Sequence, residues 1–254
     1  MADLTGREPM KHPVVVALVD GSAYGASVAE HGAFLAGRAG GSLRLLHARE
    51  PRETPAQARR LLEDLGAALV DQGAPAPDLE LFEGEVAAAA MTARADLLVM
   101  GKRGASDVPE RLGNNVAPAI AALDTPLCLV SKIYLPIHRV LAVTDADPAK
   151  RAVLDLVANH PGFAEVELDL VVVSASQEAA EDKLGIARRA LDGRARAFAI
   201  HAERLGEAIW RYLAERPADL IVISRAVLLS SGETDLRQVR PGGLWSARAS
   251  VLVC

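Results

Sequence analysis

Aromatic residues, cysteines and long hydrophobic runs are scarce in this sequence, and each shortage excludes a class of protein. Aromatics make up 4% of the 254 residues, so the core must be built from Ala, Val and Leu. Two isolated cysteines, Cys128 and Cys254, supply neither a zinc cluster nor a disulfide framework, which indicates small buried thiols in a reducing compartment. No apolar run approaches the roughly 18 residues that span a bilayer. The polar N-terminus also lacks a secretory segment, so we expect a cytoplasmic protein without membrane contact.

A basic excess and the common catalytic motifs are missing as well. The formal net charge of -5 gives no basic face for nucleic acid. The six histidines form no H-E-x-x-H pattern, and His47 and His201 are expected to be hydrogen-bonded structural residues. The G-x-S-x-G, G-x-x-x-x-G-K-[ST] and G-x-G-x-x-G motifs are absent, which disfavours a serine hydrolase, a P-loop NTPase and a dinucleotide enzyme. We therefore expect little or no catalysis.

What the sequence does contain is a regular alternation of apolar strand-like runs and amphipathic helical segments. In the first half, strands are predicted at 14–19, 42–48, 78–82, 97–100 and 127–130, with helices at 23–38, 54–70, 86–94 and 116–123. Alternating strands and helices indicate a parallel sheet covered by helices on both faces. Ligands of such sheets bind beyond the carboxyl ends of the strands, where Asp20, Ala48 and Gly101 should meet.

The second half repeats this layout. Asp145 follows a strand as Asp20 does, an offset of 145 − 20 = 125, and Asp219 matches Asp96 with 219 − 96 = 123. In the second half we expect strands at 140–144, 166–173, 196–201, 218–222 and 251–254, and helices at 177–191 and 205–214. The sequence thus predicts two tandem open parallel-sheet, Rossmann-like domains of five strands each, at 1–133 and 134–254, divided within the 132–138 segment.

The stretch from Ala95 to Asn115 carries the strongest functional signal. An apolar strand ends at Gly101-Lys102-Arg103-Gly104, a polar loop follows, and Gly113-Asn114-Asn115 precedes a helix. Glycines let backbone N–H groups approach an anion closely. This order of elements predicts a phosphate site.

Val-Asp-Gly-Ser after the first strand, together with Ala-Asp-Leu-Leu-Val-Met-Gly-Lys-Arg-Gly, resembles the universal stress protein family. The resemblance covers nearly the whole chain as two copies and implies the adenine nucleotide alpha hydrolase-like fold. It also implies that backbone amides of the glycine turn hold the triphosphate of ATP, with or without Mg²⁺. In the implied complex the acidic residue after the first strand lies by the nucleoside, and the adenine lies against the end of the second strand. Carried over to this sequence, the implied binding residues are Val19, Asp20, Ala48, Met100, Gly101, Lys102, Arg103, Gly104, Gly113, Asn114 and Asn115.

Two departures from the family motif fall in this loop. Eight residues separate Gly104 from Gly113, one fewer than usual, and Asn114 stands where the family has Ser or Thr. An Asn amide still donates hydrogen bonds. Lys102 and Arg103 either meet phosphates or are solvated. The matching place in the second copy, Ser224 to Leu228, has no Gly-x-x-Gly, so we expect nucleotide in the first domain only.

Two functions remain open from the sequence. The first is a stress-response or signalling module that binds ATP in its first domain, with at most weak hydrolysis. The second is a nucleotide-free structural or interaction module that acts through dimerisation or partners. In both, the two repeats are expected to pack as an intrachain pseudo-dimer, and association into a homodimer stays open.

Overall fold

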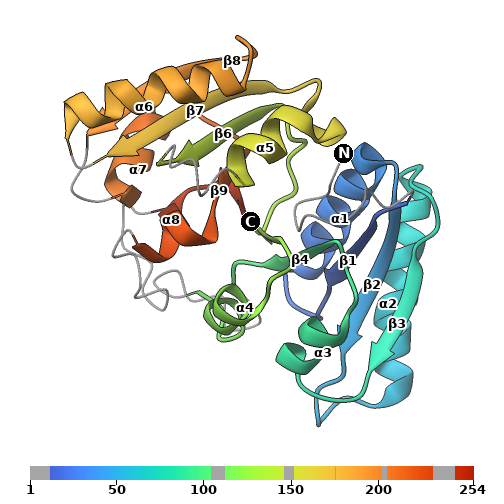
Figure 1. Ribbon diagram of the computed structural model, residues 1–254. Coiled ribbons are helices and arrows are strands. Elements are labelled where there is room, and N and C mark those ends of the chain that lie inside the picture. Colours follow the sequence, from blue (N-terminus) through green and yellow to red (C-terminus); the bar gives the residue numbers. More distant parts are fainter. Residues whose placement is uncertain (1–11, 104–111, 146–151, 175, 202–204, 231–243) are drawn as a thin grey trace. The chain divides into compact units, whose positions relative to one another are not determined.

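The computed structural model describes residues 12–103, 112–145, 152–174, 176–201, 205–230 and 244–254 (Figure 1). The chain forms two compact units, Met1–Pro136 and Ile137–Cys254. The division lies three residues after the predicted one at 133. Within the described ranges, no helix has the length and apolar character that crossing a bilayer requires.

Unit 1 is an open, five-stranded parallel sheet. Its elements are β1 (Val14–Leu18), α1 (Gly25–Ala39), β2 (Ser42–Ala48), α2 (Pro55–Asp71), β3 (Asp78–Phe82), α3 (Val86–Thr92), β4 (Leu97–Gly101), α4 (Val116–Ala122) and β5 (Leu127–Val130). The strand order is β3-β2-β1-β4-β5, and each neighbouring pair is parallel. The order reverses between β1 and β4, which makes their carboxyl ends the expected ligand edge.

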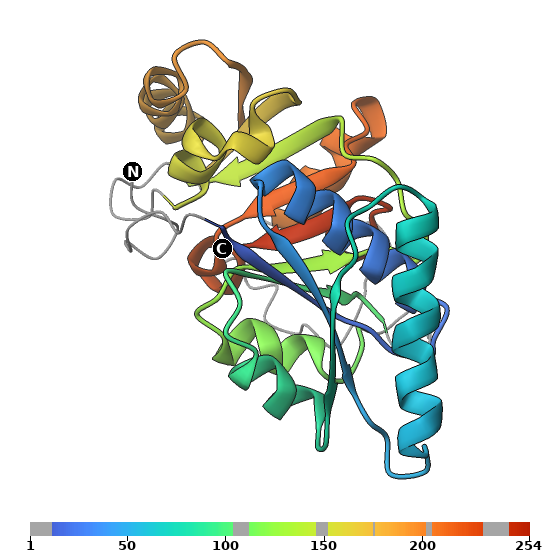
Figure 2. The same cartoon turned by 90° about the vertical axis from the view of Figure 1, so that its right-hand side faces the viewer.

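Local sequence explains where the helices of unit 1 begin and end. Thr54 caps α2 in a capping box with Gln57, and Pro55 occupies the first turn, where its missing N–H costs nothing. Helix α1 ends at Gly40, whose φ of 62° is a left-handed conformation that favours glycine. Contacts join α1 to α2 and α3 to α4, and right-handed crossovers place these pairs on opposite faces of the sheet (Figure 2).

Unit 2 repeats the same topology. Its elements are β6 (Arg139–Thr144), α5 (Ala152–Asn159), η2 (Pro161–Phe163), β7 (Glu167–Ser174), α6 (Gln177–Ala190), β8 (Ala195–His201), α7 (Leu205–Glu215), β9 (Leu220–Ile223), α8 (Arg225–Ser230), η3 (Leu244–Ser246) and β10 (Ser250–Val253). The order β10-β9-β6-β7-β8 corresponds strand by strand to unit 1, and these pairs are parallel too. The predicted α/β fold with two five-stranded sheets is confirmed.

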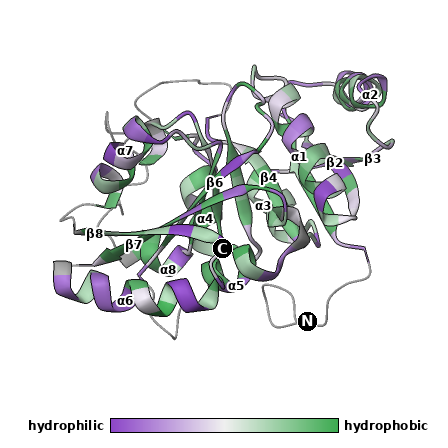
Figure 3. Cartoon of the chain, turned by 90° about the horizontal axis from the view of Figure 1, so that it is seen from above, coloured by the Kyte–Doolittle hydropathy of each residue, from purple (hydrophilic) through white to green (hydrophobic). Residues whose placement is uncertain are grey.

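The core of each unit is aliphatic, as the scarcity of aromatics requires. Strand residues such as Val16, Val99, Leu141 and Val222 are fully buried. Figure 3 shows hydrophobic colouring along the strands, while helices such as α6 and α7 mix hydrophobic and hydrophilic residues. Continuous apolar strands are typical of parallel sheets that are covered on both faces.

The repeat extends to individual hydrogen bonds at the amino ends of the strands. In unit 1 the Asp96 carboxylate accepts a hydrogen bond from the N–H of Val14 at 2.8 Å. In unit 2 the Asp219 carboxylate accepts from the N–H groups of His138 and Arg139, both at 2.9 Å. Each aspartate precedes the fourth strand of its unit and satisfies the first backbone donors of the neighbouring strand.

Two helices of unit 2 lie where the sequence pattern predicted none. Helix α5 is mostly aliphatic, and Val153, Leu154, Leu156 and Val157 are all buried. Short apolar segments of this kind give a weak periodicity signal, because helix and strand both bury them. Helix α8 follows β9 after a single residue, Ser224.

Candidate functional site

The acidic end of β1 is held in a tight turn. Asp20 follows the strand, and its Oδ1 accepts hydrogen bonds from the N–H and the hydroxyl of Ser22. The Ser22 hydroxyl oxygen in turn accepts from the N–H of Tyr24 at 3.1 Å. A Cβ on Gly25 would lie 2.2 Å from the carbonyl oxygen of Asp20, so only glycine can start α1 this close to the turn. The turn therefore fixes the Asp20 carboxylate at the carboxyl edge of the sheet.

The glycine turn after β4 is closed by backbone hydrogen bonds. The N–H of Lys102 donates to the carbonyl of Val130 at 3.0 Å, and the Lys102 carbonyl accepts from the N–H of Gly113 at 2.9 Å. The second bond joins the two ends of the predicted phosphate loop. Residues 104–111, including the predicted Gly104, lie outside the described residues.

Gly101 has a packing reason to be glycine. A Cβ there would lie 2.9 Å from the carbonyl oxygen of Arg103 and 3.0 Å from the Cβ and Cδ1 atoms of Tyr24. The buried Tyr24 side chain thus packs directly on the end of β4. The contact requires a small residue at position 101.

A cavity of about 280 Å³ opens at this edge of unit 1. Nine of the eleven predicted binding residues line it, namely Val19, Asp20, Ala48, Met100, Gly101, Arg103, Gly113, Asn114 and Asn115. Among the described residues, Tyr24, His47, Glu50 and Val86 line it as well, with further aliphatic neighbours. Residues nearly 100 positions apart in the sequence thus meet around one space.

Lys102, although predicted for the site, does not line this cavity. Its side chain is 2% exposed, so it is not solvated either. Burial, followed by the positive charge of nearby Arg103, lowers the pKa of Lys102 to about 7, which the neighbouring Cys128 partly opposes. Arg103 is the basic residue of the turn that reaches the cavity. Of the two cations, Arg103 therefore has access to a ligand in this space.

His47 connects the ends of β1 and β2 beside the cavity. Its Nδ1 lies 2.8 Å from the carbonyl oxygen of Val19, and its Nε2 lies 2.7 Å from a carboxylate oxygen of Glu53. Both partners are acceptors, so an imidazolium that donates through both nitrogens satisfies the arrangement. The ring is 3% exposed, and it is the hydrogen-bonded structural histidine that the sequence suggested.

Tyr24, His47, Glu50 and Val86 were not among the predicted site residues. Tyr24 precedes the first residue of α1, Val86 is the first residue of α3, and Glu50 follows β2. The rule that ligand sites gather at the carboxyl ends of parallel strands could have found all four positions. It could not have shown that the Tyr24 ring turns inward.

The matching edge of unit 2 is built differently. Ser224 follows β9, its hydroxyl oxygen accepts from the N–H of Val227 at 3.1 Å, and α8 begins at the next residue, Arg225. Helix α8 thus starts at the position of the glycine turn.

Together, the parallel sheet, the switch point between β1 and β4 and the cavity at that edge define unit 1 as a Rossmann-like α/β domain. Residues 11–130 match the model of the Universal stress protein family, so the chain carries a universal stress protein domain in its first unit. No curated protein sequence matches the chain.

Solved structures share the fold over both units. The chain is similar to a putative universal stress protein from Pseudomonas aeruginosa UCBPP-PA14, with a TM-score of 0.66 and 15% identity over 96% of this chain and 93% of that one. A universal stress protein from Archaeoglobus fulgidus DSM 4304 gives a TM-score of 0.64 and 15% identity over 95% and 96%. A functionally unknown protein, PA1789 from Pseudomonas aeruginosa PAO1, gives a TM-score of 0.65 and 15% identity over 96% of this chain and 92% of that one. At this identity the likeness concerns the fold.

Proposed function

We propose that unit 1 binds an adenine nucleotide, ATP, in the cavity at the β1–β4 edge, and that the chain serves as a stress-response or signalling module with little or no catalysis. The observation that carries the proposal is the convergence of Asp20, Ala48, Arg103 and Gly113 on one cavity, with the Lys102–Gly113 hydrogen bond joining the ends of the loop. A carboxylate and the ends of a glycine-bounded loop around one cavity suit a ligand with a sugar between a base and phosphates.

The size and polarity of the cavity fit the nucleoside part of such a ligand. Its volume of about 280 Å³ is near the lower end of small-molecule sites. Asp20 can accept hydrogen bonds from ribose hydroxyls. Arg103 and the amide groups of Asn114 and Asn115 are donors for phosphates on the loop side. The phosphates would then extend over the loop, outside the cavity itself.

Any Mg²⁺ would be carried mainly by the nucleotide. Across the part of the chain that the structure describes, no group of three His, Cys, Asp or Glu side chains could hold a metal ion. Mg²⁺ often keeps several waters and binds through substrate phosphates, so this arrangement is compatible with a nucleotide-borne ion.

The contact between Gly101 and Tyr24 favours a second candidate, a nucleotide-free interaction module. It explains one glycine of the motif by packing alone, without a phosphate. In that case the cavity would be a remnant of the fold, and the output would depend on protein partners.

Two measurements separate these functions. The purified chain is extracted and assayed for bound adenine nucleotide, and calorimetry measures ATP binding to nucleotide-free protein. We expect a dissociation constant in the sub-millimolar range, lost in Gly104→Val, which changes the loop, and in Ala48→Leu, which fills the cavity. Gly37→Ala is the matched control, because a Cβ there meets no atom within 4 Å. Absence of ATP from the extract together with no binding by calorimetry would refute the proposal.

A further inference from the structure

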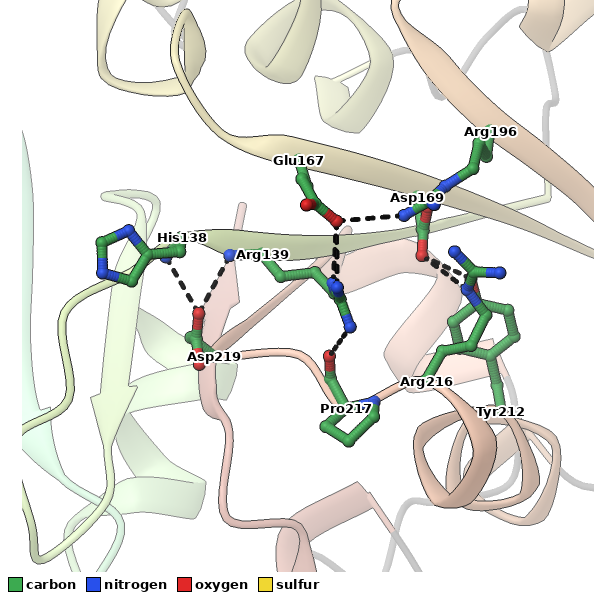
Figure 4. A network of polar contacts seen from close by, with 9 residues as sticks. All are labelled: His138, Arg139, Glu167, Asp169, Arg196, Tyr212, Arg216, Pro217 and Asp219. Atoms are coloured by element: carbon green, nitrogen blue, oxygen red, sulfur yellow. Dashed lines mark hydrogen bonds and ion pairs between the residues drawn. The ribbon is translucent and has the colours of Figure 1, made fainter.

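The amino edge of the sheet in unit 2 carries a buried carboxylate between arginines (Figure 4). Asp169, on β7, is 1% exposed. Its Oδ1 accepts from Nε of Arg196 at 2.7 Å, and its Oδ2 accepts from the Tyr212 hydroxyl at 2.7 Å and from Nε of Arg216 at 3.2 Å. This edge lies at the opposite ends of the strands from the ligand edge.

The Asp169 carboxylate is ionised and fixed in place. Burial opposes its ionisation, but the hydrogen bonds from Tyr212 and Arg196 and the charges of Arg196 and Arg216 outweigh it and lower the pKa of Asp169. A buried anion with these partners holds both guanidinium groups by their Nε atoms. The outer ends of both groups therefore face away from the carboxylate.

Arg216 leaves the whole end of its guanidinium group available. Of its five N–H donors, only the one on Nε has a partner among the described residues. The group lies over the Phe198 ring at 5.6 Å, and Phe198 packs edge-on against Tyr212 with ring centroids 5.4 Å apart. These contacts restrict the side chain, which is still 33% exposed. The free fork of two Nη groups matches the two oxygens of an oxyanion.

Arg196 adds a second oriented guanidinium beside the first. Its Nε donates to Asp169 and its Nη2 donates to Glu167 at 3.2 Å, which leaves Nη1 without a partner among the described residues. Its side chain is 50% exposed. Arg139 donates to the same Glu167 oxygen at 3.0 and 3.1 Å. Three arginines and two carboxylates leave a net charge of 3 − 2 = +1 on this cluster.

We propose that Arg196 and Arg216 form a binding site for a phosphate group, either inorganic phosphate or a phosphate monoester, at the amino edge of unit 2. Asp169, Tyr212 and Phe198 are positioning residues that hold the two guanidinium groups. The site is distinct from the nucleotide cavity of unit 1, and it stands whether or not that cavity binds ATP.

Unit 1 shows what a purely structural ion pair looks like at the corresponding position. Arg44 corresponds to Asp169 by the offset 169 − 44 = 125, and it makes one 3.1 Å ion pair with Glu80 and donates to the Ala93 carbonyl. One arginine is enough to join the strands there. Unit 2 instead buries the acid and brings two arginines to the surface around it, which joining strands does not require.

The test is a titration of ¹⁵N-labelled full-length protein followed through the arginine Nε–Hε signals. The probes are inorganic phosphate and phenyl phosphate at pH 8, with acetate and chloride added at the same ionic strength. Arg196→Gln and Arg216→Gln assign the two signals. Arg211→Gln is the matched control, because Arg211 is an exposed arginine of α7 whose ion pair with Glu207 lies outside the cluster.

We expect saturable movement of the Arg196 and Arg216 signals with both phosphates, and affinity weakened at least about tenfold in Arg216→Gln. Arg216→Lys should restore part of the affinity, since it keeps the charge but loses the fork. If the two signals move with inorganic phosphate but not with phenyl phosphate, the ligand is restricted to the free phosphate ion. Equal movement with chloride or acetate, movement of the Arg103 signal only, or an equal loss in Arg211→Gln would each overturn the proposal. If a cluster variant fails to fold, the wild-type titration against chloride decides alone.

Discussion

The N–H of Gly113 donates a hydrogen bond of 2.9 Å to the carbonyl oxygen of Lys102. This bond joins the two ends of the loop that the sequence predicts to hold phosphate. Asn114 and Asn115, which follow Gly113, line the same cavity as Gly101 and Arg103. The loop is thus anchored to the sheet by its ends.

Gly101→Ala should destabilise unit 1. The added Cβ would lie within 3.0 Å of Tyr24 and of the Arg103 carbonyl, and overpacking of this kind costs about 1–3 kcal/mol of the free energy of unfolding. Urea unfolding measures the change. Gly37→Ala, in the last turn of α1 where a Cβ meets no atom within 4 Å, should instead stabilise by about 0.5–1 kcal/mol, because Ala is the better helix former. Equal effects of both substitutions would contradict the packing assignment.

Lys102→Met should stabilise the protein at neutral pH. In the unfolded chain this lysine keeps its proton up to a pKa of about 10.5, whereas in the folded chain burial lowers its pKa to about 7. Folding therefore releases a proton between these values, and the stability of the wild type rises with pH across that window. The advantage of the Met variant should be largest at pH 7 and smaller at pH 9. Urea midpoints of the wild type and the variant at the two pH values test this. A difference between the two midpoints that does not shrink from pH 7 to pH 9 would refute it.

His31 should make unit 1 sensitive to acid. The ring is buried, Nδ1 lies 2.7 Å from the Ser27 carbonyl oxygen, and burial lowers its pKa from 6.5 to about 4, which the Ser27 hydrogen bond only partly opposes. The unfolded chain takes up a proton at higher pH than the folded chain. The contribution of neutral His31 to stability is thus complete above pH 6.5 and is lost as the pH falls to about 4. The free energy of unfolding lost in this way is at most about 3 kcal/mol.

The His31 prediction is checked by NMR and by stability measurements. The ring of His31 should titrate near pH 4, and His31→Gln should flatten the dependence of the urea midpoint on pH between 4 and 6.5. A ring that titrates near 6.5 in the folded protein would contradict the assignment.

Asp96→Ala and Asp219→Ala should each weaken one unit. Each carboxylate satisfies backbone donors at the start of a central strand, and removal of such a partner costs about 1–3 kcal/mol. Hydrogen exchange of the Val14 amide should accelerate in the first variant, and that of the Arg139 amide in the second. Acceleration of both amides in both variants would show that the loss is global rather than local.

The fold could be predicted because its signals are local and repeated. Apolar runs that end in Asp20 and Asp145, and the Asp96–Asp219 pair, indicate the positions of the strands and their repetition, and the alternation with helices indicates a parallel sheet. The order of the strands within each sheet was not predicted. The convergence of Val19, Ala48 and Gly113 follows from the same rules, since it needs only the carboxyl ends of neighbouring strands.

Side-chain directions could not be predicted in the same way. Lys102 and Arg103 are adjacent cations in the sequence, yet one is buried and the other lines the cavity. The inward Tyr24 ring and the arginines around Asp169 depend on contacts between distant elements. Sequence spacing indicates which residues share an edge, but packing decides which way each side chain points.

Helix α8 starts at the first residue after Ser224, at the place where unit 1 has its glycine turn. Point substitutions that return glycines to positions 224 and 227 would remove the Ser224 cap without restoring a loop. Unit 2 therefore cannot take over the nucleotide site of unit 1 through a few point substitutions. A titration with nucleotide should saturate at one molecule per polypeptide chain instead of two.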